Sequence, residues 1–322
     1  MPLQGLNGSL QGLTNSLQGF GLAADLVGYI PFLIDGYGDY LYVLARETSI
    51  NAVPRAHKIL KYDLSGSLID EWDASEITTT IPQCMKVYND EIFIKRYQNF
   101  YVYNIDGTYD RTVSINPDDI DPDWLEYTVP WVGDSVIFDD TIWTVATTIK
   151  EPEPTPWLDK SDRYVGVFGF DLNADLTSFS EYNQGDGILD DWGLDKPLAT
   201  DETSFFSHFE DDDTARFVRV NSDGEIAAYG DSASIEYQPM EYAAGNLYAF
   251  TTPYSFPGGS YRYSRWDTYK ILNPSTLEGD AKSISKPAFR LTHHNSYLYM
   301  TTVDSIIKVT PSTGAIVSEW FI

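Results

Sequence analysis

One short pattern recurs six times in this sequence, and the repeat limits the possible fold more than any other feature. Each copy consists of an apolar strand, a turn rich in Asn, Asp, Ser and Gly, and a second short strand. A single small sheet cannot bury its own faces, so repeats of roughly 40–50 residues are typical of folds whose units pack against one another. The copies begin at Lys58, Tyr101, Val165, Arg216, Tyr269 and Ile306.

The repeat predicts an all-β fold, a six-bladed β-propeller of four-stranded antiparallel blades. In the last copy, four successive apolar segments read as strands at 288–292, 297–302, 305–310 and 315–320. We expect one propeller domain over residues 27–322 and a separate arm over residues 1–26. Contact between the first and last blades should close the ring without strand exchange. The alternative is that residues 21–35 add a strand to the sixth blade.

The turns between the two strands of each copy support the hairpin assignment. Ser65-Gly66, Asp106-Gly107 and Asp223-Gly224 place glycine where a tight turn requires a positive φ. These generic motifs resemble the six-bladed propeller class and are loosely similar to NHL-type repeats. They contain neither a WD dipeptide signature nor a complete Asp-box.

The predicted strand order places the longer connections on one face of the propeller. Connections between the second and third strands of a blade leave the same face as connections between blades. Binding residues are often carried on such loops, so we expect recognition at this face. The alternative is that the segments fill gaps or contact a neighbouring subunit. The long segments are 47–57, 73–81, 115–130, 149–162, 183–197 and 253–266.

Aromatic and arginine residues in these segments are the candidates for ligand contact. Aromatic rings interleaved with arginine suit stacking on sugars or a protein interface. Tyr261 and Tyr263 could instead extend a strand and face the core. The predicted ligand-binding residues are Trp157, Trp192, Tyr254, Tyr261, Arg262, Tyr263, Arg265 and Trp266.

The net charge of −27 excludes some partners and suggests two explanations. A chain with 48 acidic and 21 basic residues repels nucleic acid and anionic membranes, so we expect neither as a partner. No apolar run is long enough for a membrane helix, so membrane insertion is not expected. The acidity indicates either adaptation to high salt or calcium sites. We expect no cofactor other than calcium, and the weak metal-site candidates are Asp118, Asp119, Asp121 and Asp123.

Two other sequence features resemble functional sites, but we interpret both as structural. Asp171, Asn173 and Asp175 have the spacing that starts a calcium loop, but the required glycine and distal glutamate are missing. A plain turn is therefore the preferred interpretation. The single cysteine, Cys84, lies in an apolar segment and predicts a buried residue rather than a nucleophile.

The first twenty residues carry a seven-residue repeat. Apolar residues at alternating spacings of three and four predict a helical seam, whereas the interspersed glycines oppose an isolated helix. We therefore expect an arm that becomes ordered against another surface and promotes assembly. The alternatives are a tail packed on its own propeller and an unstructured leader. The seam residues are Leu3, Leu6, Leu10, Leu13, Leu17 and Phe20.

The combination of a packing arm, a single propeller and no secretory signal looks like a tail, spike or vertex protein of a tailed virus. The acidity is similar to that of proteins from salt-loving hosts. This resemblance in overall form implies a non-enzymatic virion protein that oligomerises or joins other virion proteins. Its ligand would be a host-surface glycan or glycoprotein.

Three alternatives to this interpretation stay open at the level of sequence. The first is a propeller-type hydrolase or lyase with carboxylates at the channel mouth, which needs no local motif. The second is a purely structural subunit whose loops only contact neighbours. The third concerns location, because an acidic protein of this kind would also suit the cytoplasm of a halophilic cell.

Overall fold

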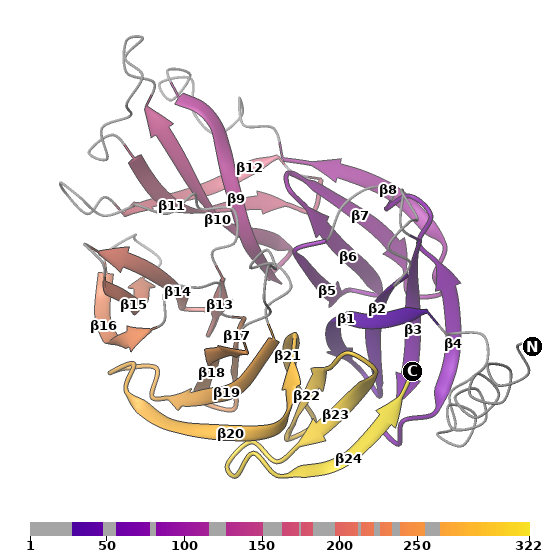
Figure 1. Ribbon diagram of the computed structural model, residues 1–322. Coiled ribbons are helices and arrows are strands. Elements are labelled where there is room, and N and C mark those ends of the chain that lie inside the picture. Colours follow the sequence, from indigo (N-terminus) through magenta and orange to yellow (C-terminus); the bar gives the residue numbers. More distant parts are fainter. Residues whose placement is uncertain are drawn as a thin grey trace, which may run out of the picture.

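A computed structural model shows six antiparallel sheets of four strands each, arranged around a common centre (Figure 1). No helix occurs among the residues that the structure describes, and thus none that could span a membrane. The predicted all-β, six-bladed propeller is confirmed. The described residues are 28–47, 56–77, 82–115, 127–150, 163–173, 175–182, 197–211, 214–221, 226–233, 239–254 and 265–322.

Each blade is built from four strands that are consecutive in the sequence. Blades 1 and 2 contain β1 (Tyr29–Tyr37), β2 (Tyr40–Glu47), β3 (His57–Asp63), β4 (Leu68–Asp73), β5 (Cys84–Tyr88), β6 (Glu91–Arg96), β7 (Asn99–Asn104) and β8 (Tyr109–Ser114). Blades 3 and 4 contain β9 (Tyr127–Phe138), β10 (Thr141–Lys150), β11 (Arg163–Asp171), β12 (Leu176–Tyr182), β13 (Ala199–Thr200), β14 (Ser204–Asp211), β15 (Thr214–Asn221) and β16 (Ile226–Ala233). Blades 5 and 6 contain β17 (Met240–Ala243), β18 (Asn246–Tyr254), β19 (Arg265–Leu272), β20 (Gly279–Ala288), β21 (Arg290–His294), β22 (Tyr297–Thr301), β23 (Ser305–Val309) and β24 (Ile316–Phe321).

The first strand of every blade is innermost, and the inner strands contact one another in ring order (Figure 1). β21 of blade 6 contacts β1 of blade 1, while each of the two strands pairs only within its own sheet. The ring therefore closes by contact of the first and last blades, as expected, and residues 29–35 belong to blade 1.

The apolar core consists of six clusters, one for each interface between neighbouring blades. β2 shows how one strand serves two interfaces, because successive side chains point to opposite faces of a sheet. Leu41 and Val43 pack toward blade 6, whereas Tyr42 and Leu44 pack toward blade 2. Both faces of the blade are thus buried, which explains why β2 is buried at every position from Leu41 to Ala45.

A tryptophan of one blade packs beneath a turn glycine of the next blade at two of these interfaces. Trp72 on β4 lies against Gly107, and Trp320 on β24 lies against Gly66 across the closing interface. Both glycines have positive φ values, of 84° and 92°, and a Cβ atom on either would overlap the indole ring. Glycine is therefore required at these turns both for the backbone conformation and for the close approach.

Side-chain oxygens stabilise turns between the third and fourth strands of a blade. Asp63 Oδ1 accepts the N–H groups of Ser65 and Ser67 at 2.9 and 2.8 Å. Asp171 Oδ1 likewise accepts the N–H groups of Asn173 and Asp175 at 2.8 and 3.0 Å. Asp171, Asn173 and Asp175 thus belong to a hydrogen-bonded turn, the interpretation that was preferred to a calcium loop.

The strand bounds confirm that the longer connections leave a single face. Consecutive antiparallel strands alternate in direction, so connections alternate between the two faces. The stretches between the first and second and between the third and fourth strands never exceed the six residues of 273–278 and 310–315. The long connections 48–56, 74–83, 115–126, 151–162, 183–198 and 255–264 all belong to the opposite face, which we call the loop face.

The contact between Gly66 and Trp320 yields a stability prediction. Gly66→Ala should lower the free energy of unfolding by about 3 kcal/mol, because backbone strain and overlap with the ring add together. Gly38→Ala is the matched control, since Gly38 also has a positive φ but faces open space. Gly38→Ala should lower the free energy of unfolding by about 1 kcal/mol. Urea unfolding followed by tryptophan fluorescence measures both.

The same measurement in a Trp320→Ala background separates the two contributions to the Gly66 effect. With the indole removed, Gly66→Ala should cost about as much as Gly38→Ala, because only the backbone strain is left. An unchanged cost of Gly66→Ala in that background would contradict the contact between Gly66 and Trp320.

Candidate functional site

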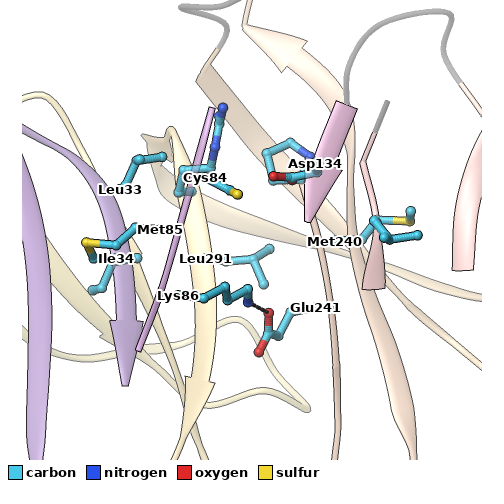
Figure 2. A pocket seen from close by; sticks show the side chains of 12 residues that line it. Leu33, Ile34, Cys84, Met85, Lys86, Asp134, Met240, Glu241 and Leu291 are labelled. Carbon is cyan, nitrogen blue, oxygen red and sulfur yellow. Dashed lines mark hydrogen bonds and ion pairs between the residues drawn. The ribbon is translucent and has the colours of Figure 1, made fainter. Parts of the chain in front are cut away.

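A cavity of about 390 Å³, part of it open to solvent, lies at the centre of the ring (Figure 2). All six blades contribute to its wall through the inner strands or through the residues that directly precede them. We call this cavity the channel pocket. Its lining residues are Leu33, Ile34, Cys84, Met85, Lys86, Asp134, Leu198, Pro239, Met240, Glu241, Arg290 and Leu291.

The channel pocket lies toward the loop face. Cys84 and Arg290 are the first residues of β5 and β21, and Leu198 and Pro239 directly precede β13 and β17. Inner strands begin where the connections between blades end, which is the loop face. The pocket and the long connections are therefore on the same side of the propeller.

The inner end of the pocket contains an ion pair that spans the ring. Lys86 Nζ of blade 2 lies 3.3 Å from Glu241 Oε2 of blade 5, and these blades are opposite each other in a ring of six. Figure 2 shows this pair at one end of the cavity, Cys84 and Asp134 at the other, and Leu291 between them. Both side chains of the pair keep about a fifth of their surface accessible.

Carboxylates outnumber ammonium groups around Lys86. Burial alone would lower the pKa of Lys86, but the charges of Glu241, Asp35 and Asp134 outweigh burial and raise this pKa. The pKa of the Glu241 carboxyl is also raised, because burial and the charge of Asp35 together exceed the effect of Lys86. Lys86 is therefore held as a cation at neutral pH.

Asp35 on β1 joins three blades at their inner strands. Its Oδ2 accepts the Val87 N–H at 2.7 Å, and its Oδ1 accepts the Thr292 hydroxyl at 3.2 Å. These bonds connect blade 1 to blades 2 and 6. Asp35 thus supplies negative charge to the channel while its oxygens hold the ring together.

Lys95 is a buried lysine that stands directly behind the pocket wall. It pairs with Cys84 across β5 and β6 and is fully buried. Its Nζ donates to Gly133 O, Ser135 Oγ and Thr144 Oγ1 at 2.6, 2.7 and 2.6 Å, which links blade 2 to blade 3. Burial lowers the pKa of Lys95 to about 8, against the opposing charges of Cys84 and Asp134.

Cys84 is buried, as the sequence predicted. Burial, together with the charge of Asp134, raises the pKa of its thiol, so the thiolate is scarce at neutral pH. This environment does not favour a nucleophile.

The residues predicted from sequence to bind a ligand are mostly outside the described part of the chain. Tyr254 and Arg265 lie at the ends of β18 and β19, beside the long connection 255–264. Trp266 is fully buried and stacks on Phe250 between blades 5 and 6, so its assignment as a ligand contact is wrong. Packing in the core explains its ring. Residues outside the described part are Trp157, Trp192, Tyr261, Arg262, Tyr263, the metal candidates Asp118, Asp119, Asp121 and Asp123, and the arm residues Leu3, Leu6, Leu10, Leu13, Leu17 and Phe20.

Sequence reasoning missed the charged residues of the channel pocket. Lys86 and Glu241 lie in short, otherwise apolar segments that form inner strands, and a charge within such a strand was the available signal. Their pairing joins residues from opposite blades, which no local spacing reveals. Within the described ranges, no group of three or more His, Cys, Asp or Glu residues is placed to hold a metal ion.

Comparison with known proteins supports the fold alone. No family model and no curated protein matches the chain. Among solved structures, a protein of unknown function from Bacteroides caccae is 8% identical, with a TM-score of 0.52 over 82% of this chain and 90% of that one. BamB from Moraxella catarrhalis is 11% identical, with a TM-score of 0.41 over 85% of this chain and 94% of that one. The WD40 domain of Pan2 from Neurospora crassa is 6% identical, with a TM-score of 0.46 over 88% and 89%.

The buried Lys95 predicts a pH dependence of stability. Its native pKa of about 8 lies below the ordinary value of 10.5. Between these values the unfolded chain binds more protons than the native one, so the free energy of unfolding rises with pH. The free energy of unfolding of the wild type, taken relative to that of Lys95→Met, should rise by about 3 kcal/mol between pH 8 and pH 10.5. Urea unfolding at several pH values measures this difference.

Lys58→Met is the control for this experiment, because hydrogen bonding to Glu71 raises the pKa of Lys58. Its stabilising contribution is present at pH 8 and is lost as the pH rises above 10.5. The difference in free energy of unfolding between the wild type and Lys95→Met should therefore rise with pH, whereas the difference between the wild type and Lys58→Met should fall with pH. Parallel curves for the wild type and Lys95→Met would show that Lys95 does not titrate in this window.

Proposed function

We propose that this chain is a non-enzymatic binding protein that recognises its ligand on the loop face. In the form that the sequence favours, it is an attachment protein of a virion and is docked to other virion proteins through residues 3–20. The ligand would then be a glycan or glycoprotein of the host surface.

The main support for this proposal is that the long connections and the channel pocket share one face. The other face carries only short turns, several of which are closed by side-chain hydrogen bonds such as those of Asp63 and Asp171. A propeller that merely filled space would have no need to collect its insertions on one side. Loops held by a rigid ring are a common arrangement for recognition.

The arrangement of the channel carboxylates supports binding more than hydrolysis. A glycosidase or lyase needs carboxyl groups that can exchange protons with a substrate. Asp35 instead accepts two hydrogen bonds from neighbouring blades, and Glu241 is paired with Lys86. Asp35 and Glu241 are therefore both engaged in contacts between blades.

A printed glycan array can test recognition by the loop face. The labelled full-length protein should bind neutral glycans in preference to sialylated or sulfated ones, because a net charge of −27 repels anions. Trp157→Ala and Tyr261→Ala should each reduce binding by about tenfold, as expected for aromatic contacts. Ile69→Ala is the control, since Ile69 on β4 is 51% exposed but remote from the loop-face connections.

Two results of the array experiment would count against the proposal. One is binding that Ile69→Ala weakens as much as Trp157→Ala does. The other is turnover of a bound glycan, detected by mass spectrometry, which would favour the hydrolase or lyase alternative.

The assembly role of the N-terminal arm has its own test. Removal of residues 1–20 should convert a defined oligomer into a folded monomer, because the apolar seam of Leu3 to Phe20 is lost. Light scattering coupled to size-exclusion chromatography in molar salt measures the mass. A full-length protein that is already monomeric would remove the basis for docking through the arm.

A further inference from the structure

The outer edges of blades 6 and 1 expose a group of apolar side chains. Val317 on β24 is 52% exposed, and Ile69 on β4 is 51% exposed. Phe321 is 40% exposed, while Leu68 and Val303 are each 38% exposed. Five of the seven large apolar side chains that are exposed in the described part of the chain thus belong to two adjoining blades. We call these five residues the rim patch.

Two contacts bring the parts of the rim patch together. Trp320 on β24 packs beneath Gly66 in the turn that leads into β4, so the end of β24 lies beside the start of β4 (Figure 1). The Ile322 N–H donates to Asp304 O at 3.0 Å, which places the connection that carries Val303 beside the end of β24. The rim patch therefore lies across the closing interface of the ring. Exposed apolar surface gathered in one place is typical of an interaction site.

The chain enters the ring beside the same interface. Tyr29, the first residue of β1, packs in the apolar cluster between blades 6 and 1, and so does Ile322. Three strand spacings, about 14 Å, separate β1 from the outer strand of its blade. Residues 21–28 span up to about 26 Å when extended. Two copies with facing rims therefore place the arm of each copy within reach of the rim patch of the other.

The arm suits this surface in length and in charge. Residues 3–20 would be about 27 Å long as a helix, and β4 and β24 are each about 20 Å long. Residues 1–20 contain no charged side chain, although the net charge of the chain is −27. Copies of such a chain repel each other, so an uncharged apolar segment is the part that approaches a second copy at the lowest electrostatic cost.

We propose that the rim patch binds residues 3–20 of a second copy of this chain, and that the exchange is reciprocal in a twofold pair. The apolar seam from Leu3 to Phe20 would contact the rim patch. Reciprocal exchange closes the assembly at two copies, because each copy offers one arm and one rim. This inference rests on the assembly role proposed for the arm, and it names the surface that receives the arm.

The glycines of the arm favour the rim over a bundle of arms. Gly5, Gly8, Gly12 and Gly19 each destabilise a helix by about 1 kcal/mol relative to alanine. In a bundle of arms, this cost falls on both partners, and neither offers an ordered surface to the other. The rim patch is held in place by paired strands, so only the arm has to become ordered on contact.

Light scattering coupled to size-exclusion chromatography in molar salt tests the proposal on the full-length protein. Val317→Lys and Leu68→Lys should each halve the mass, as should removal of residues 1–20, because a charge enters the apolar contact. Tyr109→Lys is the matched control, since Tyr109 on β8 is 40% exposed and occupies the position of Leu68 in the next blade. Tyr109→Lys should leave the mass unchanged.

The outcomes separate this inference from the assembly role of the arm. If removal of residues 1–20 halves the mass while Val317→Lys and Leu68→Lys do not, the arm binds elsewhere and the rim patch is not its surface. A monomeric full-length protein overturns both ideas, and a mass above that of a dimer overturns the reciprocal pair. Ile69→Ala should stay dimeric, because it adds no charge, and it then remains a control for the glycan array.

Cross-linking shows whose arm lies on the rim and needs no charged variant. Two differently tagged chains, one with Leu10→Cys and the other with Val317→Cys, are co-expressed and treated with a bismaleimide reagent. The native Cys84 is buried and should not compete. We expect a cross-link between the two chains. A cross-link only within a chain that carries both substitutions would place the arm on its own rim, and one only between two Leu10→Cys chains would indicate a bundle of arms. Either result would overturn the proposal, as would the absence of any cross-link.

Discussion

Apolar packing between neighbouring blades is the interaction on which the rest of this structure depends. Each four-stranded sheet has two apolar faces, and only the adjacent blades can cover them. A fully buried Leu, Ile, Val or Phe contributes about 1.5–3 kcal/mol relative to its exposed state, and every interface contains several. The position of each inner strand, and with it the shape of the channel, follows from this packing.

Hydrogen bonds between polar groups fix the relative positions of the blades at their inner strands. Asp35 connects blades 6, 1 and 2, while Lys95 connects blades 2 and 3 with three hydrogen bonds. Apolar contacts alone allow neighbouring sheets to slide, whereas these bonds require particular atoms to meet. The Lys86–Glu241 pair extends the same principle across the ring. These contacts fix the relative positions of the inner strands at the level of the charged groups.

The fold could be predicted from sequence because its signals are local and repeated. Alternation within strands and glycine at turns such as Gly66 and Gly107 recur often enough to indicate blades and their number. The channel pocket could not be predicted in this way. Lys86 and Glu241 are far apart in the chain, and only ring closure brings them together. Trp266 was wrongly predicted to contact a ligand, although it is buried in the core. Sequence alone does not show whether an aromatic residue beside a long loop faces a ligand or the core.

The closing interface consists of side-chain packing of the same kind as the other five, and none of the described strands is exchanged across it. Every blade is contiguous in sequence, and the blades follow one another around the ring in chain order. The ring is therefore the same whichever blade the chain starts with. No blade is topologically the first, and a circularly permuted chain that began at any interblade connection would specify the same six sheets and the same interfaces. The chain termini could accordingly be moved to another interblade connection without redesigning the propeller.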